Sequence, residues 1–254
     1  MIQRLNFNYK PWVVIAALVA GWQWGTSDPH LVSDTLAPPL PVAEAVVQMI
    51  ANGSVIVAGA ETLLAALLGL MLGGGIGLAI GLVAGMTKGV AMAIRGPVEA
   101  LRPLPAIALV PLMTITFGLG LPMEVYVVAF AVVWPCVILT QHAVQNVDRR
   151  LIEVADVLEL GHLARIPKII LPAIWPRLIV MLRFSAAIAL LIAVTVELVS
   201  NPWGLGHEMM VAEEGFQPAK MLAYLVVITA IGWGLNWVLV SVERRFAGFQ
   251  IPQK

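Results

Sequence analysis

Long stretches of apolar side chains limit the folds that this chain can adopt. A helix that crosses a lipid bilayer needs about 20 consecutive, mostly apolar residues. Five stretches of the sequence are long enough, at residues 55–86, 94–117, 123–144, 172–199 and 221–242. Charged residues make up only 12% of the chain, about half of the share that is typical of soluble domains. We therefore predict an all-α polytopic membrane protein.

A sixth, shorter apolar stretch lies at residues 11–25, after Arg4 and Lys10. It has the length of a secretory signal, but the residues that follow it lack a small-x-small cleavage site. We interpret it as a retained first transmembrane helix. The predicted total is then about six transmembrane helices.

The placement of basic residues predicts the orientation. If the N-terminus is cytoplasmic, the opposite side of the membrane keeps only Lys220 among the basic residues between spans. The cytoplasmic segments then hold Arg4, Lys10, Lys88, Arg95, Arg149, Arg150, Arg165, Lys168, Arg244, Arg245 and Lys254. This asymmetry follows the positive-inside rule. We therefore expect a multi-pass protein with a cytoplasmic N-terminus.

Glycines recur every four residues in the stretch 55–86. They are Gly69, Gly73, Gly77, Gly81 and Gly85. Small residues at this spacing form one flat helix face that lets another backbone approach closely. We favour a packing seam within the subunit, and the alternative is a dimer seam or a moving surface.

Three prolines interrupt the stretch 94–117, at Pro103, Pro105 and Pro111. Each proline lacks an N–H and bends a helix, and lipid-facing backbone does not tolerate unpaired carbonyl groups. We expect a broken helix that is buried in protein or lines a cavity. A transport pathway and a purely structural kink both account for it.

Charged side chains inside apolar spans are costly, so those that occur are informative. Glu61, Arg102, Arg183 and Glu197 lie within predicted spans, and Glu124 lies nearer the end of one. Arg183 and Glu197 are 14 residues apart, about 21 Å along a continuous helix, so they cannot pair directly. We favour interhelical salt bridges as the role of these charges. The alternative is that Arg102, Arg183 and Glu197 line the route of a polar or anionic solute.

Patterns typical of catalysis are missing from the sequence. His30, His142, His162 and His207 are scattered without ligand spacing, and Cys136 is the sole cysteine, so we predict no metal site and no disulfide. A glycine-rich phosphate loop ending in Gly-Lys-Ser/Thr does not occur, so we expect no ATP hydrolysis by this chain. The classes left open are a transporter subunit, an ATPase-independent secondary transporter or channel, and a membrane scaffold.

The polar stretch EVADVLELGHLARIPKIILP at residues 153–172 resembles a family signature. It is similar to the EAA loop of the permease subunits of ATP-binding-cassette (ABC) importers, with the pattern E-A-A-x-x-x-G-x9-I-x-L-P. Glu153 and Ala155 match its first and third positions, and Ile169, Leu171 and Pro172 fall at the expected distance.

The stretch departs from the pattern at two positions. Val154 replaces the second alanine conservatively, and Glu159 stands where the pattern has glycine, with Gly161 two residues later. Glycine tolerates backbone angles that other residues resist. We therefore expect the turn to be displaced, to Gly161 for example, or the first short helix to run longer.

Further similarities place the chain nearest the nitrate/sulfonate/taurine branch of these permeases. LRPLPAIALVPLMTITFGLG (101–120) is similar to the branch's LRPIPPLAWLPLxxxWFGxG. TLAPPLPVAEAV (35–46) resembles its LPSP segment, and VELVSNPWGLGHEM (196–209) resembles its AEMIG…GLGYLI segment. The similarities are in the same order along both chains and cover roughly residues 36–246.

The resemblance implies the type I ABC importer permease fold, with short cytoplasmic coupling helices at about residues 148–168. It divides the chain into an N-terminal helix and outer connection at 1–54, a permease core at 55–246 and a cytoplasmic tail at 247–254. The residues that it implies in coupling to the ATPase are Glu153, Ala155, Asp156, Glu159 and Gly161.

The resemblance also implies a function and partners. A permease of this kind forms the translocation pathway for a small solute, here an organic or inorganic anion of the sulfonate, nitrate or taurine type. It works in the bacterial cytoplasmic (inner) membrane as two copies, expected here as a homodimer, with an ATP-binding cassette ATPase dimer and an extracytoplasmic substrate-binding protein. ATP and Mg are used by the ATPase, so the chain itself is expected to be a pore subunit without cofactor or enzymatic site. An ATPase-independent secondary transporter or channel is the alternative.

Overall fold

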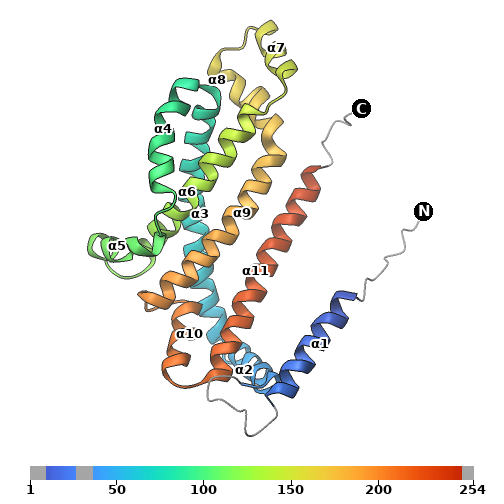
Figure 1. Ribbon diagram of the computed structural model, residues 1–254, viewed down its shortest axis with the longest axis vertical. Helices are drawn as coiled ribbons and strands as arrows, with labels where there is room; N and C mark the ends of the chain where they lie inside the picture. Colours follow the sequence, from blue (N-terminus) through green and yellow to red (C-terminus); the bar gives the residue numbers. More distant parts are fainter. Residues whose placement is uncertain (1–9, 27–36, 248–254) are drawn as a thin grey trace, which may run out of the picture.

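Every regular element in the described part of the chain is helical, as predicted. The computed structural model describes residues 10–26 and 37–247 (Figure 1). The N-terminal half contains α1 (Lys10–Gly25), α2 (Pro39–Ala51), α3 (Ser54–Met86), α4 (Lys88–Leu101), the 3₁₀ turn η1 (Ala106–Leu109), α5 (Val110–Phe117) and α6 (Leu121–Gln145). The C-terminal half contains α7 (Arg149–Val157), α8 (His162–Arg165), the π-helical turn η2 (Ile166–Ile170), α9 (Leu171–Val199), α10 (Leu205–Glu214) and α11 (Pro218–Ala247).

Four helices among the described residues are long and apolar enough to cross a membrane. They are α3, α6, the continuous helix Leu163–Val199 that contains α9, and α11. A fifth span results if α4 and α5 are counted together, although they are bent by 85°. The sixth predicted span, α1, has 16 residues and is therefore about 24 Å long, less than the ~30 Å hydrocarbon core.

The predicted break in the stretch 94–117 is present, and the two helices on either side of it are bent by 85°. α4 ends at Leu101, and the chain resumes a helical path only at Ala106. Pro103 and Pro105 lie in this gap, while Pro111 lies in the first turn of α5, where a missing N–H costs nothing. The stretch 94–117 is therefore two separate helices rather than one interrupted span.

The glycine face of α3 packs against α6 within the same chain. A Cβ on Gly77 would lie 2.5 Å from Cβ of Cys136, and one on Gly81 would lie 2.6 Å from Cβ of Thr140. Gly69, Gly73 and Gly85 meet α6 as closely. The favoured interpretation, a seam within the subunit, is confirmed, and α9 packs along the resulting α3–α6 pair.

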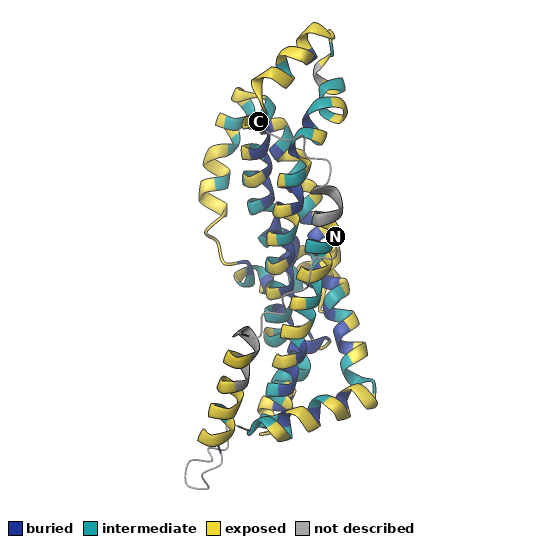
Figure 2. Cartoon of the chain, turned by 90° about the vertical axis from the view of Figure 1, so that its right-hand side faces the viewer, coloured by how far each residue is buried: buried dark blue, intermediate teal, exposed yellow. Residues whose placement is uncertain are grey.

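The bundle has two distinct ends. We call the end that carries α7 and α8 the α7 end, and the opposite end, which carries α10 and α2, the α10 end (Figure 1). Buried residues follow the inner helices, and exposed residues cover the elements that project from them (Figure 2). Residues 37–58 and 205–231 contribute an apolar cluster at the α10 end, separate from the main cluster along α3, α6 and α9.

Candidate functional site

The EAA-like stretch forms a helix, a tight turn and a second short helix at the α7 end. α7 begins after Asp148, whose carboxylate accepts a 2.9 Å hydrogen bond from the backbone N–H of Arg150, as a helix cap does. Ala155 is fully buried, and it is the one buried residue of α7. Glu153 is exposed and forms a 3.4 Å surface ion pair with Arg149.

Glu159 occupies a left-handed backbone conformation, with φ at +50°. The N–H of Leu160 donates to the carbonyl of Ala155, and the N–H of Glu159 donates to that of Asp156, both at 3.0 Å. These two bonds define a Schellman motif, whose left-handed position favours glycine. The prediction of a turn displaced to Gly161 or of a longer first helix is wrong: the turn stays at Glu159, and Gly161 is extended at φ −62° and ψ 156°, just before α8.

Arg165 joins the two short helices. Its Nη2 atom is 2.7 Å from Oδ1 of Asp156, and its Nε atom donates a 2.7 Å hydrogen bond to the carbonyl of Leu160. The Arg165 side chain is 20% exposed, against 59% for Asp156. Of the coupling residues that the resemblance implies, Asp156 thus has the clearest local role, which is to hold α7 against the segment that follows it.

The α7 end also presents apolar side chains to its surroundings. Val157, Leu158 and Leu163 are 83%, 60% and 84% exposed. Exposed apolar side chains grouped with charged ones are typical of an interaction surface. α7, its Schellman turn and α8 therefore form a compact projecting element that exposes apolar side chains beside charged ones.

A second group of polar residues is buried near the α10 end. Glu197, near the end of α9, and Glu124, in the first turn of α6, are 1% and 2% exposed. Oε2 of Glu197 accepts hydrogen bonds from the N–H of Gly206, at 2.8 Å, and from the hydroxyl of Thr62 in α3, at 3.0 Å. Oε2 of Glu124 accepts a 2.6 Å bond from the amide of Asn201. We call Thr62, Glu124, Glu197 and Asn201, together with the partly exposed Glu61, the buried carboxyl cluster.

The turn Gly204–Leu205–Gly206 faces this cluster with its backbone. The N–H of Gly204 donates to Oε2 of Glu61, at 3.1 Å, and that of Leu205 donates to the Thr62 hydroxyl, at 2.9 Å. Gly204 has φ at +96°, and a Cβ there would collide with the Glu197 carboxylate. Both glycines of the turn are therefore required, because a side chain at Gly206 would also meet the backbone of α9.

The predicted pathway residues do not come together. Glu197 lies in the buried carboxyl cluster, whereas Arg102 is exposed just after α4. Arg183 pairs with Glu243 of α11 at 3.2 Å, so the interhelical salt bridge that we favoured is confirmed for Arg183. For Glu197 it is wrong, because its partners are a hydroxyl and a backbone N–H.

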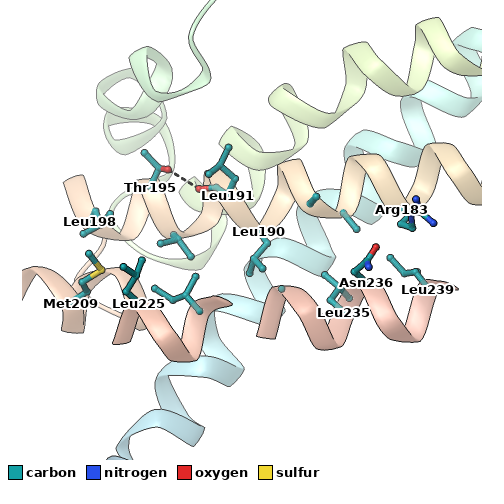
Figure 3. Close-up of a pocket in the computed structure, with 15 residues that line it drawn as sticks. Arg183, Leu190, Leu191, Thr195, Leu198, Met209, Leu225, Leu235, Asn236 and Leu239 are labelled. Carbon is teal, nitrogen blue, oxygen red and sulfur yellow. Dashed lines mark hydrogen bonds between the residues drawn. The ribbon is translucent and has the colours of Figure 1, made fainter. Parts of the chain in front are cut away.

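Arg183 lines a cavity of about 460 Å³ between α9 and α11 (Figure 3). Leu190, Leu235 and Leu239 give that cavity a mostly apolar wall, and Asn236 lies near the same end as Arg183. α11, which forms one wall of this cavity, is the least buried of the four long apolar helices among the described residues.

The sequence marks Glu61, Glu124 and Glu197 as unusual charges within apolar segments, but it gives no sign of Thr62 and Asn201. A buried threonine in a helix gives no sequence signal, and Asn201 lies two residues after a predicted span, near a helix end where asparagine is an ordinary residue. The repeated glycines of the segment 204–206 were the available signal, since they mark a close approach of backbone.

Comparison with known proteins agrees with this architecture. A family model described as binding-protein-dependent transport system inner membrane component matches residues 73–248. The putative aliphatic sulfonates transport permease protein SsuC of Escherichia coli (strain K12) is 29% identical over 231 residues, 91% of this chain and 88% of that protein. The taurine transport system permease protein TauC of the same organism is 28% identical over 148 residues, 58% of this chain and 54% of that protein.

The fold also matches a solved structure. An inward-facing conformation of the MetNI methionine ABC transporter superposes with a TM-score of 0.62 at 15% identity, over 82% of this chain and 97% of that one. The two chains therefore share a fold. Because the family model covers more than half of the sequence, the chain belongs to the family of binding-protein-dependent transport system inner membrane components.

Proposed function

We propose that this permease forms the pathway of an importer for a small anion and receives its energy from a separate ATPase at the α7 end. The observation that carries the proposal is the projecting α7–α8 element, which combines exposed apolar side chains with a fixed internal geometry. A surface that transmits force between two proteins needs both properties. In this arrangement the α7 end and the N-terminus are cytoplasmic, as the basic residues indicate.

The coupling residues act in two ways under this proposal. Val157, Leu158 and Leu163 enter a groove of the ATPase, while Glu153 sets the register by charge. Ala155, Asp156, Glu159 and Gly161 shape the element from within. ATP and Mg are bound by the ATPase dimer, and this chain supplies no nucleotide site of its own.

The substrate class follows from the relatives. The sulfonate and taurine permeases to which the chain is similar support a small organic anion, with nitrate-like anions as the inorganic counterpart. An extracytoplasmic binding protein delivers the anion to a pathway between two copies of the permease, which we propose to be a homodimer.

Reconstitution into proteoliposomes tests the proposal. The wild-type chain is combined with its cognate ATPase and binding protein, and uptake of a labelled sulfonate is measured with and without ATP. Val157→Asp and Leu163→Asp are expected to abolish ATPase association and ATP-driven uptake, because they place charges on the docking face. Glu99→Gln is the control, since Glu99 is exposed and lies on α4.

The alternative class predicts a different result. A secondary transporter or channel would move the anion without ATP, and its activity would not respond to the two docking variants. Uptake that persists without the ATPase would therefore overturn the proposal.

A further inference from the structure

The buried carboxyl cluster brings three glutamates together without a cationic side chain. None of the ion pairs between described residues involves Glu61, Glu124 or Glu197. Among the described residues, Glu197 and Glu61 act by charge on Glu124, and Glu61 also acts by charge on Glu197. Two ionised carboxyl groups at this depth, with the partly exposed Glu61 beside them, would repel one another strongly.

The N-terminus of α10 compensates part of this charge. The three successive N–H groups of residues 204, 205 and 206 point into the cluster, toward Glu61, Thr62 and Glu197. A helix N-terminus supplies about half of a positive charge. That amount cannot balance two buried carboxylates, so another positive charge is needed.

The unpaired atoms of the cluster show where that charge belongs. Oε1 of Glu124, Oε1 of Glu197 and Oδ1 of Asn201 are buried hydrogen-bond acceptors without a donor among the described residues. Glu124 is bound by the side chain of Asn201, whose backbone N–H donates to the carbonyl of Val196, the residue before Glu197, so the two carboxyl groups lie at the same end of α9. One proton placed between them turns two unpaired acceptors into a donor and its acceptor.

We propose that Glu124 and Glu197 bind a single shared proton, with Glu124 as the carboxylic acid and Glu197 as the carboxylate. Glu197 is the carboxylate because its Oε2 already accepts from the Gly206 N–H and the Thr62 hydroxyl, and such bonds favour the charged form. Glu124 accepts only from the Asn201 amide. This site does not depend on the proposed ATPase coupling.

A proton fits the cluster better than a metal ion. The described residues contain no group of three or more His, Cys, Asp and Glu side chains placed to hold a metal. The backbone N–H groups of the α10 N-terminus point toward the carboxylates and would repel a metal cation there. The close contact of Gly204 with the Glu197 carboxylate also leaves little room beside it.

Infrared spectroscopy of the purified permease in lipid nanodiscs detects the proton directly. At neutral pH the wild type is expected to show the carbonyl stretch of a buried carboxylic acid, which Glu124→Gln removes. Glu213→Gln, at an exposed carboxylate of α10, is the matched control and is expected to keep the band. A wild-type spectrum without an acid band sensitive to Glu124→Gln would overturn the proposal.

Thermal unfolding gives a second readout. At neutral pH an unfolded glutamate is ionised, so unfolding releases the proton that the folded chain holds, and the midpoint of the wild type is expected to fall as the pH rises. Glu124→Gln keeps the shape of the acid and is expected to flatten this dependence, whereas Glu213→Gln leaves it parallel to the wild type. If Glu124→Gln does not fold, the wild type alone tests the proposal: the carboxylic-acid band must be present at neutral pH and must disappear at alkaline pH.

A third measurement, in which the sodium concentration is varied, distinguishes a bound proton from a bound metal ion. The midpoint is measured at constant pH and ionic strength with sodium replaced by choline. The proposal predicts equal midpoints. A midpoint that rises specifically with sodium would assign the cluster to a metal cation and contradict the shared proton.

Discussion

Nη2 of Arg165 lies 2.7 Å from Oδ1 of Asp156, and this ion pair connects α8 to α7. Arg165 also donates to the Leu160 carbonyl in the turn between them. One guanidinium group thus holds both a side chain of the first helix and the backbone of the turn. A planar group with several donors can do this, and a lysine ammonium cannot reproduce the geometry.

Arg165→Lys is therefore expected to uncouple the permease from its ATPase while leaving the fold intact. The ion pair is partly exposed, so its loss is expected to change the free energy of unfolding by no more than about 1 kcal/mol. ATP-driven uptake in proteoliposomes is expected to fall several-fold. Arg149→Lys is the control, because Arg149 is 93% exposed and holds no backbone group in place. Equal uptake by the two variants would contradict the role of Arg165.

Glu159→Gly is expected to stabilise the turn. A residue with a Cβ in the left-handed region costs about 1 kcal/mol more than glycine, and Glu159 has φ at +50°. Hydrogen–deuterium exchange of the Leu160 amide, which bonds to the Ala155 carbonyl, is expected to slow about fivefold, the rate equivalent of about 1 kcal/mol. Glu159→Ala separates the backbone effect from the charge, since alanine keeps the strained conformation. If alanine slows the exchange as much as glycine, the charge and not the conformation is responsible.

Gly77→Ala is expected to destabilise the bundle, and Gly75→Ala is not. A Cβ at position 77 would lie 2.5 Å from Cβ of Cys136 and 2.7 Å from the carbonyl oxygen of Val133, whereas a Cβ at position 75 meets nothing within 4 Å. Forcing α3 and α6 apart is expected to cost about 1–3 kcal/mol. The thermal midpoints of the two variants in detergent measure this difference. Equal midpoints would show that the seam can open without cost.

Arg183→Gln and Glu243→Gln are each expected to lower the free energy of unfolding by the same amount, and the double variant is expected to lower it by no more than either one. The two side chains form one interhelical pair at 3.2 Å, so either substitution removes the whole interaction, worth about 1 kcal/mol. Thermal unfolding of the wild type and the three variants gives the interaction energy between the two side chains. The KM for uptake is expected to stay unchanged. A KM that rises for Arg183→Gln alone would instead place Arg183 on the substrate route.

The features that were predictable from sequence depend on local patterns. The apolar spans follow from hydropathy, and the glycine seam follows from a four-residue period that fixes one helix face. The EAA-like stretch was located by the spacing of its residues. The position of its turn was not, because Glu159 adopts angles for which glycine is preferred and contacts such as the Arg165 bonds hold it there.

The features that escaped prediction depend on contacts between distant segments. Glu61, Glu124 and Glu197 lie on three helices, and nothing in their separations of 63 and 73 residues indicates that they meet. The 85° bend between α4 and α5 is a further case, since prolines predict a break but not its angle. A single sequence specifies where a helix stops more readily than where it goes next.

The helix from Leu163 to Val199 has 37 residues without a sharp bend, and it carries α8 at one end and Glu197 near the other. At 1.5 Å per residue it is about 55 Å long, so a tilt of about 5° at one end displaces the other by about 5 Å. Because one helix joins the α7 end to the α10 end, a tilt of this helix moves both ends of the permease together. A displacement of the short helix is therefore passed along one helix, through the π-helical turn η2, toward the buried carboxyl cluster.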